Sequence, residues 1–387
     1  MLLVNARLFP MSISAPSVID AGFLRVVEGK IVAIGDMADC ITPAPDELVF
    51  DAAGQSCFPG FIDAHCHVGM WEDGLAFEGD DGNEDTDPCT PHLRAMDGVN
   101  GFDRCFADAA VAGVTTLVIS PGSANVIAGQ IFAYKSGTVG QVMNDQPLAM
   151  KFALGENPKT TYHAKSQAPV TRMGIAALIR EQLAKARDYA NALAEAESDE
   201  DVDKPEYDAK CESLLGVLRG EMTAHFHAHR ADDILTALRI CEEFSMKPVI
   251  VHGTDATLTA DLLAKRKVPV LAGPLLCDRA KPELRALSLS TPQALYEAGV
   301  PLALVTDHPV TPIEYLPLCA ALAVRGGMDR LHALRAMTCD AAAAIGLSGK
   351  VGSLDVGCDG DFVLFAGDPL DVQVTPSAVF IEGVQVK

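Results

Sequence analysis

The sequence predicts a (β/α)8 barrel of the TIM type, joined to a small β-sandwich domain formed from both termini. Between about residues 56 and 344, short apolar runs alternate with helical stretches, which is the pattern of repeated βα units. Both ends of the chain carry short strand-like runs, and neither end alone can bury a sheet. Hydrophobic residues make up 49% of the chain but aromatic residues only 6%, so the core is mainly aliphatic, which suits parallel strands covered by helices.

These patterns divide the chain into two predicted units. We expect residues 1–55 and 345–387 to form the small β-sandwich domain and residues 56–344 to form the barrel. A helical insert around residues 160–220 and an acidic loop at residues 70–100 exceed a minimal barrel, and they would suit a lid or an oligomer contact. The predicted strands are FIDAHCH, VTTLVIS, LAMKFAL, TAHFHAH, KPVIVHG, VPVLAG and VPLALVTD, with a weaker eighth near IFAYKSG.

Charge and cysteine usage exclude several classes of protein. A net charge of −22 repels phosphate backbones, so we expect no nucleic-acid partner. No apolar run approaches the roughly 20 residues that span a bilayer, so we expect no membrane segment. The 11 cysteines lack CxxC pairs or regular spacing. They predict reduced, mostly buried thiols in a cytoplasmic protein. We also expect a small-molecule substrate, and we leave a homo-oligomeric state open.

Histidines gather at the ends of the predicted strands. His65 and His67 lie two residues apart on one strand, so both imidazoles face the same side. His227 and His229 repeat this spacing on a second strand, and His252 ends a third. The fourth strand of this kind, LALVTDHP, carries Asp307 and His308 at its end. Because barrel strands end at one rim, these side chains are expected to converge on a metal site there.

These features together resemble the amidohydrolase superfamily, near its imidazolonepropionase-like and prolidase-like branches. The resemblance is carried by NARLF…GKIVAIG, PGFIDAHCH, TDHP and VGSLDVGCDGDFVLFAGDP, and so by nearly the whole chain. It implies that His65 and His67 bind a metal, and that Asp307 binds it and acts as general base. It also implies that His227 is the third histidine ligand. His252 would then bind a second metal or contact the substrate and the transition state.

The number of metal ions depends on the predicted strand LAMKFAL, the fourth along the chain when the weak strand near IFAYKSG is counted. Binuclear members of the superfamily need a bridging anion, often a carbamylated lysine, and Lys151 in MKFALGENP has the matching context. A lysine facing an apolar interior is costly unless its charge is removed or paired. Glu156 is the rival bridge, and an ion pair of Lys151 with Glu156 or Asp307 is the alternative. We expect one or two Zn²⁺ ions, with Fe²⁺ or Mn²⁺ as other choices.

The expected activity is hydrolysis of a C–N amide bond, in a cyclic amide, an N-acyl amino acid or a dipeptide, by a metal-activated hydroxide. Deaminases of the superfamily place a glutamate three residues after the histidine that corresponds to His227, but Arg230 occupies that position. Deamination of a heterocyclic base is therefore the alternative activity. A barrel that binds metal without catalysis is a third. For the substrate, His229, Arg230, Arg94 and Asn157 are the predicted contacts, since arginine pairs with carboxylates.

Overall fold

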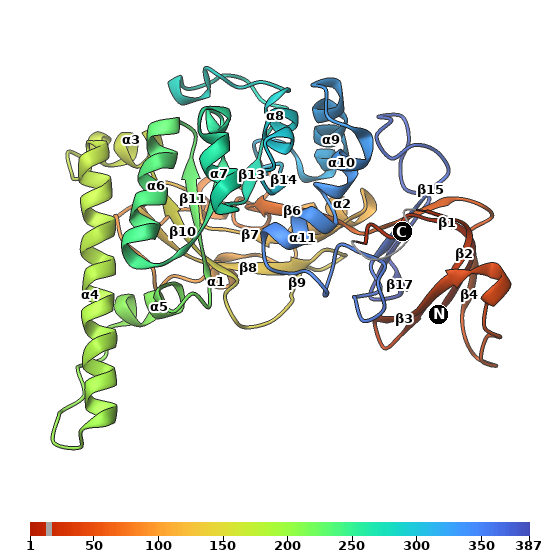
Figure 1. Ribbon diagram of the computed structural model, residues 1–387, viewed down its shortest axis with the longest axis horizontal. Helices are drawn as coiled ribbons and strands as arrows, with labels where there is room; N and C mark the ends of the chain where they lie inside the picture. Colours follow the sequence, from red (N-terminus) through yellow and green to blue (C-terminus); the bar gives the residue numbers. More distant parts are fainter. Residues whose placement is uncertain (13–17) are drawn as a thin grey trace.

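The chain forms a barrel sheet surrounded by helices and a separate sheet built from both ends of the chain, as seen in a computed structural model (Figure 1). The structure describes residues 1–12 and 18–387. The barrel sheet has nine strands and the terminal sheet has eight. The mixed α/β architecture with a nearly closed barrel sheet confirms the predicted TIM-type barrel at this level.

Eight strands follow one another around the barrel, and hydrogen bonds connect the segment after the last strand to the end of the first strand. The Asp307 N–H donates to the His65 carbonyl over 3.3 Å, and the His67 N–H donates to the His308 carbonyl over 3.0 Å. The barrel is therefore closed at the strand ends that carry the histidines. In order, its strands are β6 (Phe61–Cys66), β7 (Val114–Ile119), β8 (Ile127–Lys135), β10 (Ala149–Ala153), β11 (Thr223–Ala228), β12 (Lys247–His252), β13 (Val270–Ala272) and β14 (Leu302–Leu304).

The third strand departs from the predicted (β/α)8 pattern. The weak strand expected near IFAYKSG exists as β8, but it runs antiparallel to both β7 and β10. Residues 120–126 alone connect β7 to β8. A parallel crossover needs about a dozen residues or more, so this connection can only reverse the chain. A short strand, β9 (Gln141–Val142), pairs with β8 outside the ring.

The terminal strands hydrogen-bond into one continuous sheet, so the predicted two-sheet sandwich is not confirmed. β5 joins the two ends of the chain, because it pairs with β1 on one side and with β15 on the other. The described strands of this sheet are β1 (Leu2–Leu8), β2 (Ile19–Val27), β3 (Lys30–Asp36), β4 (Val49–Asp51), β5 (Ser56–Pro59), β15 (Phe362–Phe365), β16 (Ala378–Ile381) and β17 (Val384–Gln385). The predicted domain boundaries stay a prediction.

Helices cover the barrel, and their ends follow ordinary capping rules. In α4 the Thr171 hydroxyl accepts from the Gly174 N–H, and α6 carries Asp232 and Asp233 in its first turn, where the helix dipole favours acids. None of the described helices is both long and apolar enough to cross a membrane. The helices are α1 (Ala95–Gly98), α2 (Arg104–Val111), α3 (Glu156–Ala164), α4 (Arg172–Ser198), α5 (Ala209–Leu218), α6 (Ala231–Phe244), α7 (Ala260–Arg266), α8 (Thr291–Glu297), α9 (Leu316–Arg325), α10 (Arg330–Arg335) and α11 (Cys339–Ala344).

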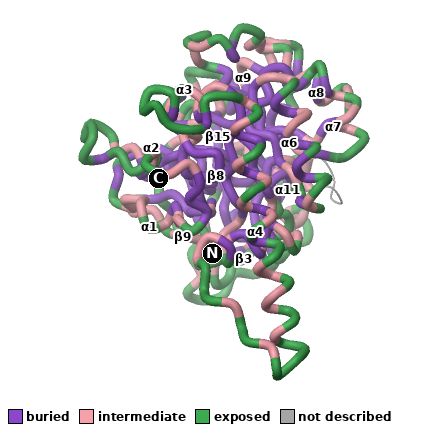
Figure 2. The backbone as a smooth tube through the Cα atoms, turned by 90° about the vertical axis from the view of Figure 1, so that its left-hand side faces the viewer, coloured by how far each residue is buried: buried purple, intermediate pink, exposed green. Residues whose placement is uncertain are grey.

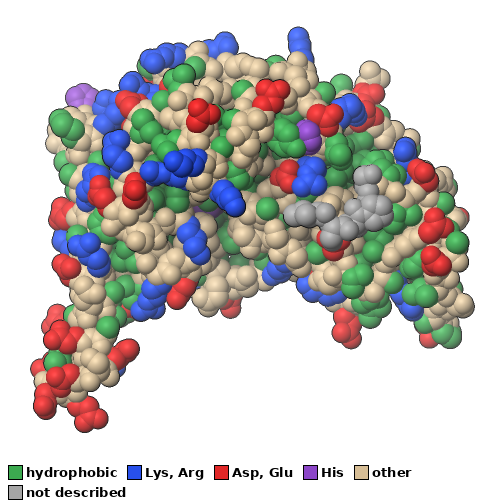
Figure 3. Space-filling view, viewed as in Figure 1, with side chains coloured by type: hydrophobic (Ala, Val, Ile, Leu, Met, Phe, Trp, Pro, Cys, Tyr) green, Lys and Arg blue, Asp and Glu red, His purple; other side chains and the backbone are tan. Residues whose placement is uncertain are grey.

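The predicted insert around residues 160–220 contains α4, α5 and most of α3. The far end of α4 projects from the molecule and is exposed, whereas the barrel strands are buried (Figures 1 and 2). The acidic stretch that follows α4 forms the tip of this projection, and acidic side chains gather there (Figure 3). Part of the net negative charge therefore lies far from the strand ends.

A buried ion cluster joins the barrel to the terminal sheet. Lys135, the last residue of β8, is only 6% exposed. Its ammonium lies 2.5 Å from the Asp361 carboxylate and 2.7 Å from that of Asp359, just before β15. Lys30 of β3 reaches the other oxygen of Asp359. Removing one partner of such a cluster leaves buried charge uncompensated.

Lys135→Met is therefore expected to lower the free energy of unfolding by about 3–5 kcal/mol. The matched control is Lys185→Met, which removes a surface pair with Glu181 in which both side chains are 56% exposed. This control should cost less than about 1 kcal/mol. Denaturant unfolding followed by circular dichroism measures both. Equal losses in the two variants would contradict the structural role of the cluster.

Candidate metal centre

The first group of metal-type ligands comes from β6 and from the segment after β14. His65 and His67 present their Nε2 atoms to one carboxylate oxygen of Asp307, at 3.3 Å each. Two ligands bonded to one tetrahedral Zn²⁺ at about 2.1 Å lie about 3.4 Å apart. The three side chains are therefore spaced as ligands of a single ion would be.

The second group lies beside the first. His227, His229 and His252 each offer one ring nitrogen, and these atoms lie within 4.8 Å of one another. The His65 and His252 ring centroids are 5.7 Å apart, so the two groups share one site. Burial holds the pKa of His227 and His229 well below the usual value, so both rings are neutral and keep a lone pair for a metal.

Hydrogen bonds on the outer ring nitrogens orient three of these imidazoles. The Nδ1 atom of His67 lies 2.6 Å from the Ser120 carbonyl, and that of His252 lies 2.8 Å from the Gly273 carbonyl. The Nδ1 atom of His229 contacts the Thr254 hydroxyl at 2.8 Å. A carbonyl accepts only from N–H, so the Nδ1 atoms of His67 and His252 carry a proton and their Nε2 atoms are directed inward. Such outer contacts are usual for histidine ligands of metals.

Asp307 is held as a carboxylate in an unusual backbone conformation. Burial opposes its ionisation, but the surrounding His252, His65 and His67 rings outweigh burial and hold its pKa well below the usual value. Asp307 and His252 both have positive φ, 54° and 74°. For residues other than glycine this conformation costs about 1–3 kcal/mol and is concentrated at functional sites. The chain bears that cost at two of the six ligand-type residues.

Asp63 fixes the two strands that carry the first group. Its buried carboxylate accepts from the His65 N–H over 3.1 Å and from the Thr306 N–H over 3.2 Å, and it also accepts from the Thr306 hydroxyl. These bonds hold the end of β6 against the segment after β14. The relative placement of His65 and Asp307 therefore depends on Asp63.

Lys151 enters the site from the middle of β10. Its ammonium nitrogen lies 3.3 Å from the His65 Nε2 atom, and the residue is 1% exposed. Burial lowers the pKa of Lys151 to about 7, so much of the amine is uncharged near neutrality. Its register partner on β11 is His225, two residues before His227. Lys151 therefore faces the same interior as the ligand-type residues.

A cavity of about 850 Å³ opens above these groups. His67, His227, His229 and Asp307 form part of its wall. Trp71 and Asn83, from the acidic loop after β6, line another part, together with Asn157 and Lys281. A volume of this size admits a small molecule. The acidic loop and the start of the helical insert thus border the space where a substrate would lie.

Of the predicted substrate contacts, His229 and Asn157 line the main cavity, whereas Arg94 does not. His229 belongs to the second histidine group and also faces the cavity. Asn157 lines the cavity, and its side chain bonds to Ser123 and Lys281 over 2.7 and 2.8 Å. Arg94 lies outside the residues that line this cavity, and its guanidinium covers the Phe132 ring at 5.5 Å.

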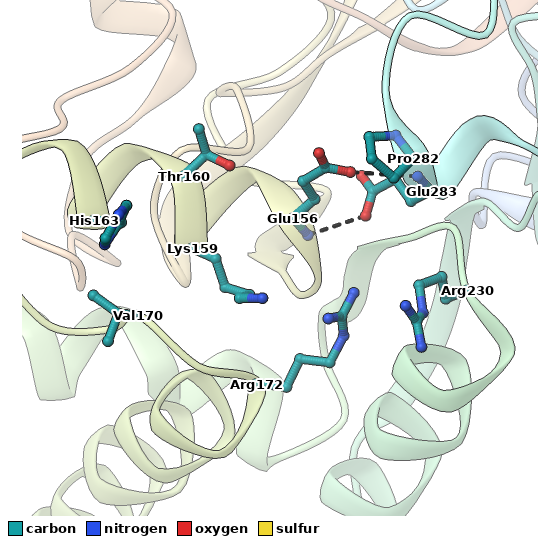
Figure 4. A pocket seen from close by; sticks show the side chains of 9 residues that line it. All are labelled: Glu156, Lys159, Thr160, His163, Val170, Arg172, Arg230, Pro282 and Glu283. Atoms are coloured by element: carbon teal, nitrogen blue, oxygen red, sulfur yellow. Dashed lines mark hydrogen bonds between the residues drawn. The ribbon is translucent and has the colours of Figure 1, made fainter.

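Arg230 lines a neighbouring pocket of about 500 Å³ (Figure 4). It forms an ion pair with Asp232 at 2.8 Å, and Arg172 reaches the pocket from α4. Glu156 borders both this pocket and the main cavity. The Glu156 carboxylate accepts from the Glu283 N–H over 3.3 Å, so it faces a loop and lies outside both ligand groups.

Sequence reasoning missed three residues of the site. His225 is fully buried, and neither ring nitrogen has a hydrogen-bond partner among the described residues. The two-residue spacing that singled out His227 and His229 would also have found it. Glu283 and Lys281 come from the loop after β13 and bring an ion pair of 2.9 Å to the second histidine group. The sequence carries no periodic signal for them.

The fluorescence of Trp71 can be used to detect metal binding at the first ligand group. Its ring stands edge-on to His67 with centroids 4.7 Å apart, and it is the single tryptophan of the chain. We expect Co²⁺ added to chelator-treated protein to quench the tryptophan fluorescence, because a paramagnetic ion on His67 would lie beside the indole. His67→Ala should remove the saturable part of the quenching. A saturable response that survives in this variant would place the ion elsewhere.

Comparison with known proteins identifies the family. The model of the amidohydrolase family matches residues 57–386. The chain therefore belongs to the amidohydrolase family, and it is a hydrolase acting on carbon–nitrogen bonds. Metal dependence is general in this family, and the two groups of histidine and aspartate ligands fit a divalent metal ion in donor type and spacing.

Individual relatives agree with this assignment. The chain is 28% identical to the amidohydrolase tasK of Hapsidospora irregularis over 94% of its own length, but it spans only 39% of that protein. It is 26% identical to an imidazolonepropionase of Sphingopyxis alaskensis, covering 95% of this chain and 92% of the relative. The crystal structure of an amidohydrolase from Thermotoga maritima superimposes with a TM-score of 0.94 at 40% identity, covering 100% and 99% of the two chains.

Proposed function

We propose that the protein hydrolyses the C–N bond of an amide in a cyclic amide, an N-acyl amino acid or a dipeptide. The observation that carries this proposal is the convergence of the two ligand groups beneath one cavity. His65, His67 and Asp307 would hold one divalent ion, and His227, His229 and His252 a second. A divalent ion at this position supplies an acidic water and polarises a carbonyl group. Zn²⁺ is the ion that this donor set favours, with Fe²⁺ and Mn²⁺ as alternatives.

Asp307 is the residue that we assign to proton transfer. Its ionised carboxylate can take a proton from the attacking water and deliver it to the leaving nitrogen. The His252 Nδ1–H donates to the Gly273 carbonyl, so its inward Nε2 lone pair would hold the second ion, and that ion would stabilise charge that develops on the carbonyl oxygen. Lys151, in carbamylated form, would supply the bridging anion. Glu156 is less suited to bridge, since its carboxylate is engaged with the Glu283 N–H.

The walls of the site favour a substrate with a carboxylate. Lys281 and Asn157 line the main cavity. In the adjoining pocket, Lys159 makes no ion pair or hydrogen bond with the described residues, and Arg172 and Arg230, which pair with Asp233 and Asp232, line another part of the wall (Figure 4). We therefore assign substrate contacts to Asn157, Lys281, Lys159 and Arg230. Arg94 is less suited, because its guanidinium packs on Phe132.

Deamination remains the alternative reaction, with less support from the residues at the site. Arg230 stands where a deaminase of this superfamily has its proton-carrying glutamate, and its guanidinium pairs with Asp232.

A Xaa-Pro dipeptidase structure shares the fold at 17% identity with a TM-score of 0.61, and this likeness concerns the fold alone. A cytoplasmic location and a homo-oligomeric state are further proposals.

The test is a substrate panel with two product assays. Purified protein loaded with Zn²⁺ is incubated with N-acyl amino acids, dipeptides and cyclic amides, and released amino groups and free ammonia are measured separately. We expect an amine or an opened ring without ammonia, activity lost after chelation, and activity restored by Zn²⁺. Ammonia released in equal amount to substrate consumed would favour deamination. Full metal loading without turnover of any amide would argue against hydrolysis of these classes.

A further inference from the structure

Glu283 brings a buried carboxylate to the second histidine group from outside the barrel strands. It lies in the short 3-10 turn Pro282–Leu284, between β13 and α8, and its side chain is 2% exposed. Figure 4 shows it beside Glu156, at the edge of the smaller pocket. A charged group at this depth needs compensating partners.

One carboxylate oxygen of Glu283 lies close to two imidazoles. Its Oε1 atom lies 3.7 Å from the His227 Nε2 atom and 3.7 Å from the His229 Nε2 atom. His227 Nε2 is buried and has no hydrogen-bond partner among the described residues, whereas Glu283 Oε1 is contacted from its other side by the Lys281 ammonium at 2.9 Å. At 3.7 Å these atoms are too far apart for a hydrogen bond and close to the roughly 3.4 Å between two ligands of one Zn²⁺ ion.

The surrounding backbone is built to hold this carboxylate in place. The other oxygen, Oε2, accepts from the Glu156 N–H over 3.0 Å, and the Glu283 N–H returns a bond to the Glu156 carboxylate. Gly155, with φ of 84°, leaves the space that this requires, because a Cβ atom there would lie 2.9 Å from Glu283 Oε2. The position of the carboxylate is therefore fixed by the turn between β10 and α3.

Lys281 accounts for only one side of the carboxylate. Its ammonium lies 2.9 Å from Oε1, but Lys281 is 27% exposed and also bonds to Asn157. This ion pair does not explain why two neutral imidazoles face the same oxygen from within the barrel. A cation between Glu283, His227 and His229 would satisfy all three atoms.

We propose that Glu283 is a ligand of the second metal ion, bound together with His227 and His229. The proposal rests on the binuclear centre of the proposed function. It assigns to the loop after β13 a ligand that none of the barrel strands supplies. This carboxylate would offset the positive charge of the second ion, because imidazole ligands contribute no negative charge.

The test compares Glu283→Gln with Glu156→Gln, which alters the partner across the same loop contact. Chelator-treated proteins are titrated with Zn²⁺, and bound metal is counted by mass spectrometry. Co²⁺-loaded proteins give visible absorption from both ions. We expect wild-type protein and Glu156→Gln to hold two ions. Glu283→Gln should hold the second ion at least about 10-fold more weakly and lose part of the Co²⁺ absorption.

Metal-free melting temperatures separate coordination from loop bracing. If Glu283 is a ligand, metal-free Glu283→Gln melts no lower than metal-free Glu156→Gln. A lower melting temperature with unchanged affinity for two ions would overturn the proposal, and so would a wild-type protein that binds a single ion at saturation. Loss of the second ion in Glu283→Gln supports the ligand role even if no amide is hydrolysed, so the two proposals fail independently.

Discussion

Asp307→Asn should lower kcat for amide hydrolysis by about 10³-fold or more, since general acid–base catalysis alone contributes about 10²–10⁴-fold. The wild-type carboxylate touches both His65 and His67 at 3.3 Å and keeps its charge because its pKa lies well below the usual value. An asparagine of the same shape has no charge for the ion and cannot accept a proton. Both losses act on the same step.

The matched control is Asp108→Asn, a surface residue of α2 that forms an i,i+4 pair with Arg104. Its kcat should stay within about 2-fold of the wild-type value, because surface pairs contribute little. Metal content and melting temperature of Asp307→Asn show whether the fold and the second ion are retained. Wild-type turnover in a folded Asp307→Asn protein would remove Asp307 from the reaction.

The strand-end histidines show how far sequence alone can predict the site. Residues two apart share one face of a strand, and parallel strands end at one rim, so His65, His227 and Asp307 could be expected to meet although they are far apart in sequence. In the structure, the His65 Nε2 atom lies 3.3 Å from the Asp307 carboxylate, and the His65 and His252 ring centroids are 5.7 Å apart. Period and topology suffice to place side chains that lie on or directly after strands.

Side chains on loops were outside the reach of that reasoning. Glu283 reaches the histidines only because the turn that carries it binds the Glu156 segment, 127 residues earlier in the chain. Arg94 and Arg230 were predicted to meet a substrate by residue type alone, and the sequence did not indicate that the Arg94 guanidinium packs on Phe132 or that Arg230, beside the smaller pocket, pairs with Asp232. The directions of such side chains depend on tertiary contacts that have no sequence period.

The direction of β8 was also missed, although the information was present. The segment at residues 120–126 is too short for a crossover, which excludes a parallel third strand. The repeated βα pattern of the other strands concealed this local constraint. Connection length is therefore a stronger guide to strand direction than similarity to neighbouring units.

Lys151→Met should lower kcat at least about 100-fold. Residues that only support a metal ligand typically cost about 10–100-fold in activity when they are mutated, and loss of a bridging anion should cost at least as much. In the wild type, burial lowers the pKa of Lys151 to about 7, and the uncharged amine can attack CO₂. An N–C bond forms, a proton leaves the nitrogen, and a carbamate anion results beside His65. Methionine fills a similar volume but cannot form this anion, so the second ion should also bind more weakly.

The chain contains its own control for the carbamate, since Lys135 is also buried but is differently surrounded. Although burial alone would lower its pKa, the Asp361 and Asp359 carboxylates raise it, so the amine stays protonated and cannot attack CO₂. Protein equilibrated with ¹³C-bicarbonate should therefore show a carbamate carbon signal in ¹³C NMR that disappears in Lys151→Met and persists in Lys135→Met. A signal that survives in Lys151→Met would assign the carbamate to another amine, and a wild-type protein without one would leave Lys151 as an ordinary buried amine beside His65.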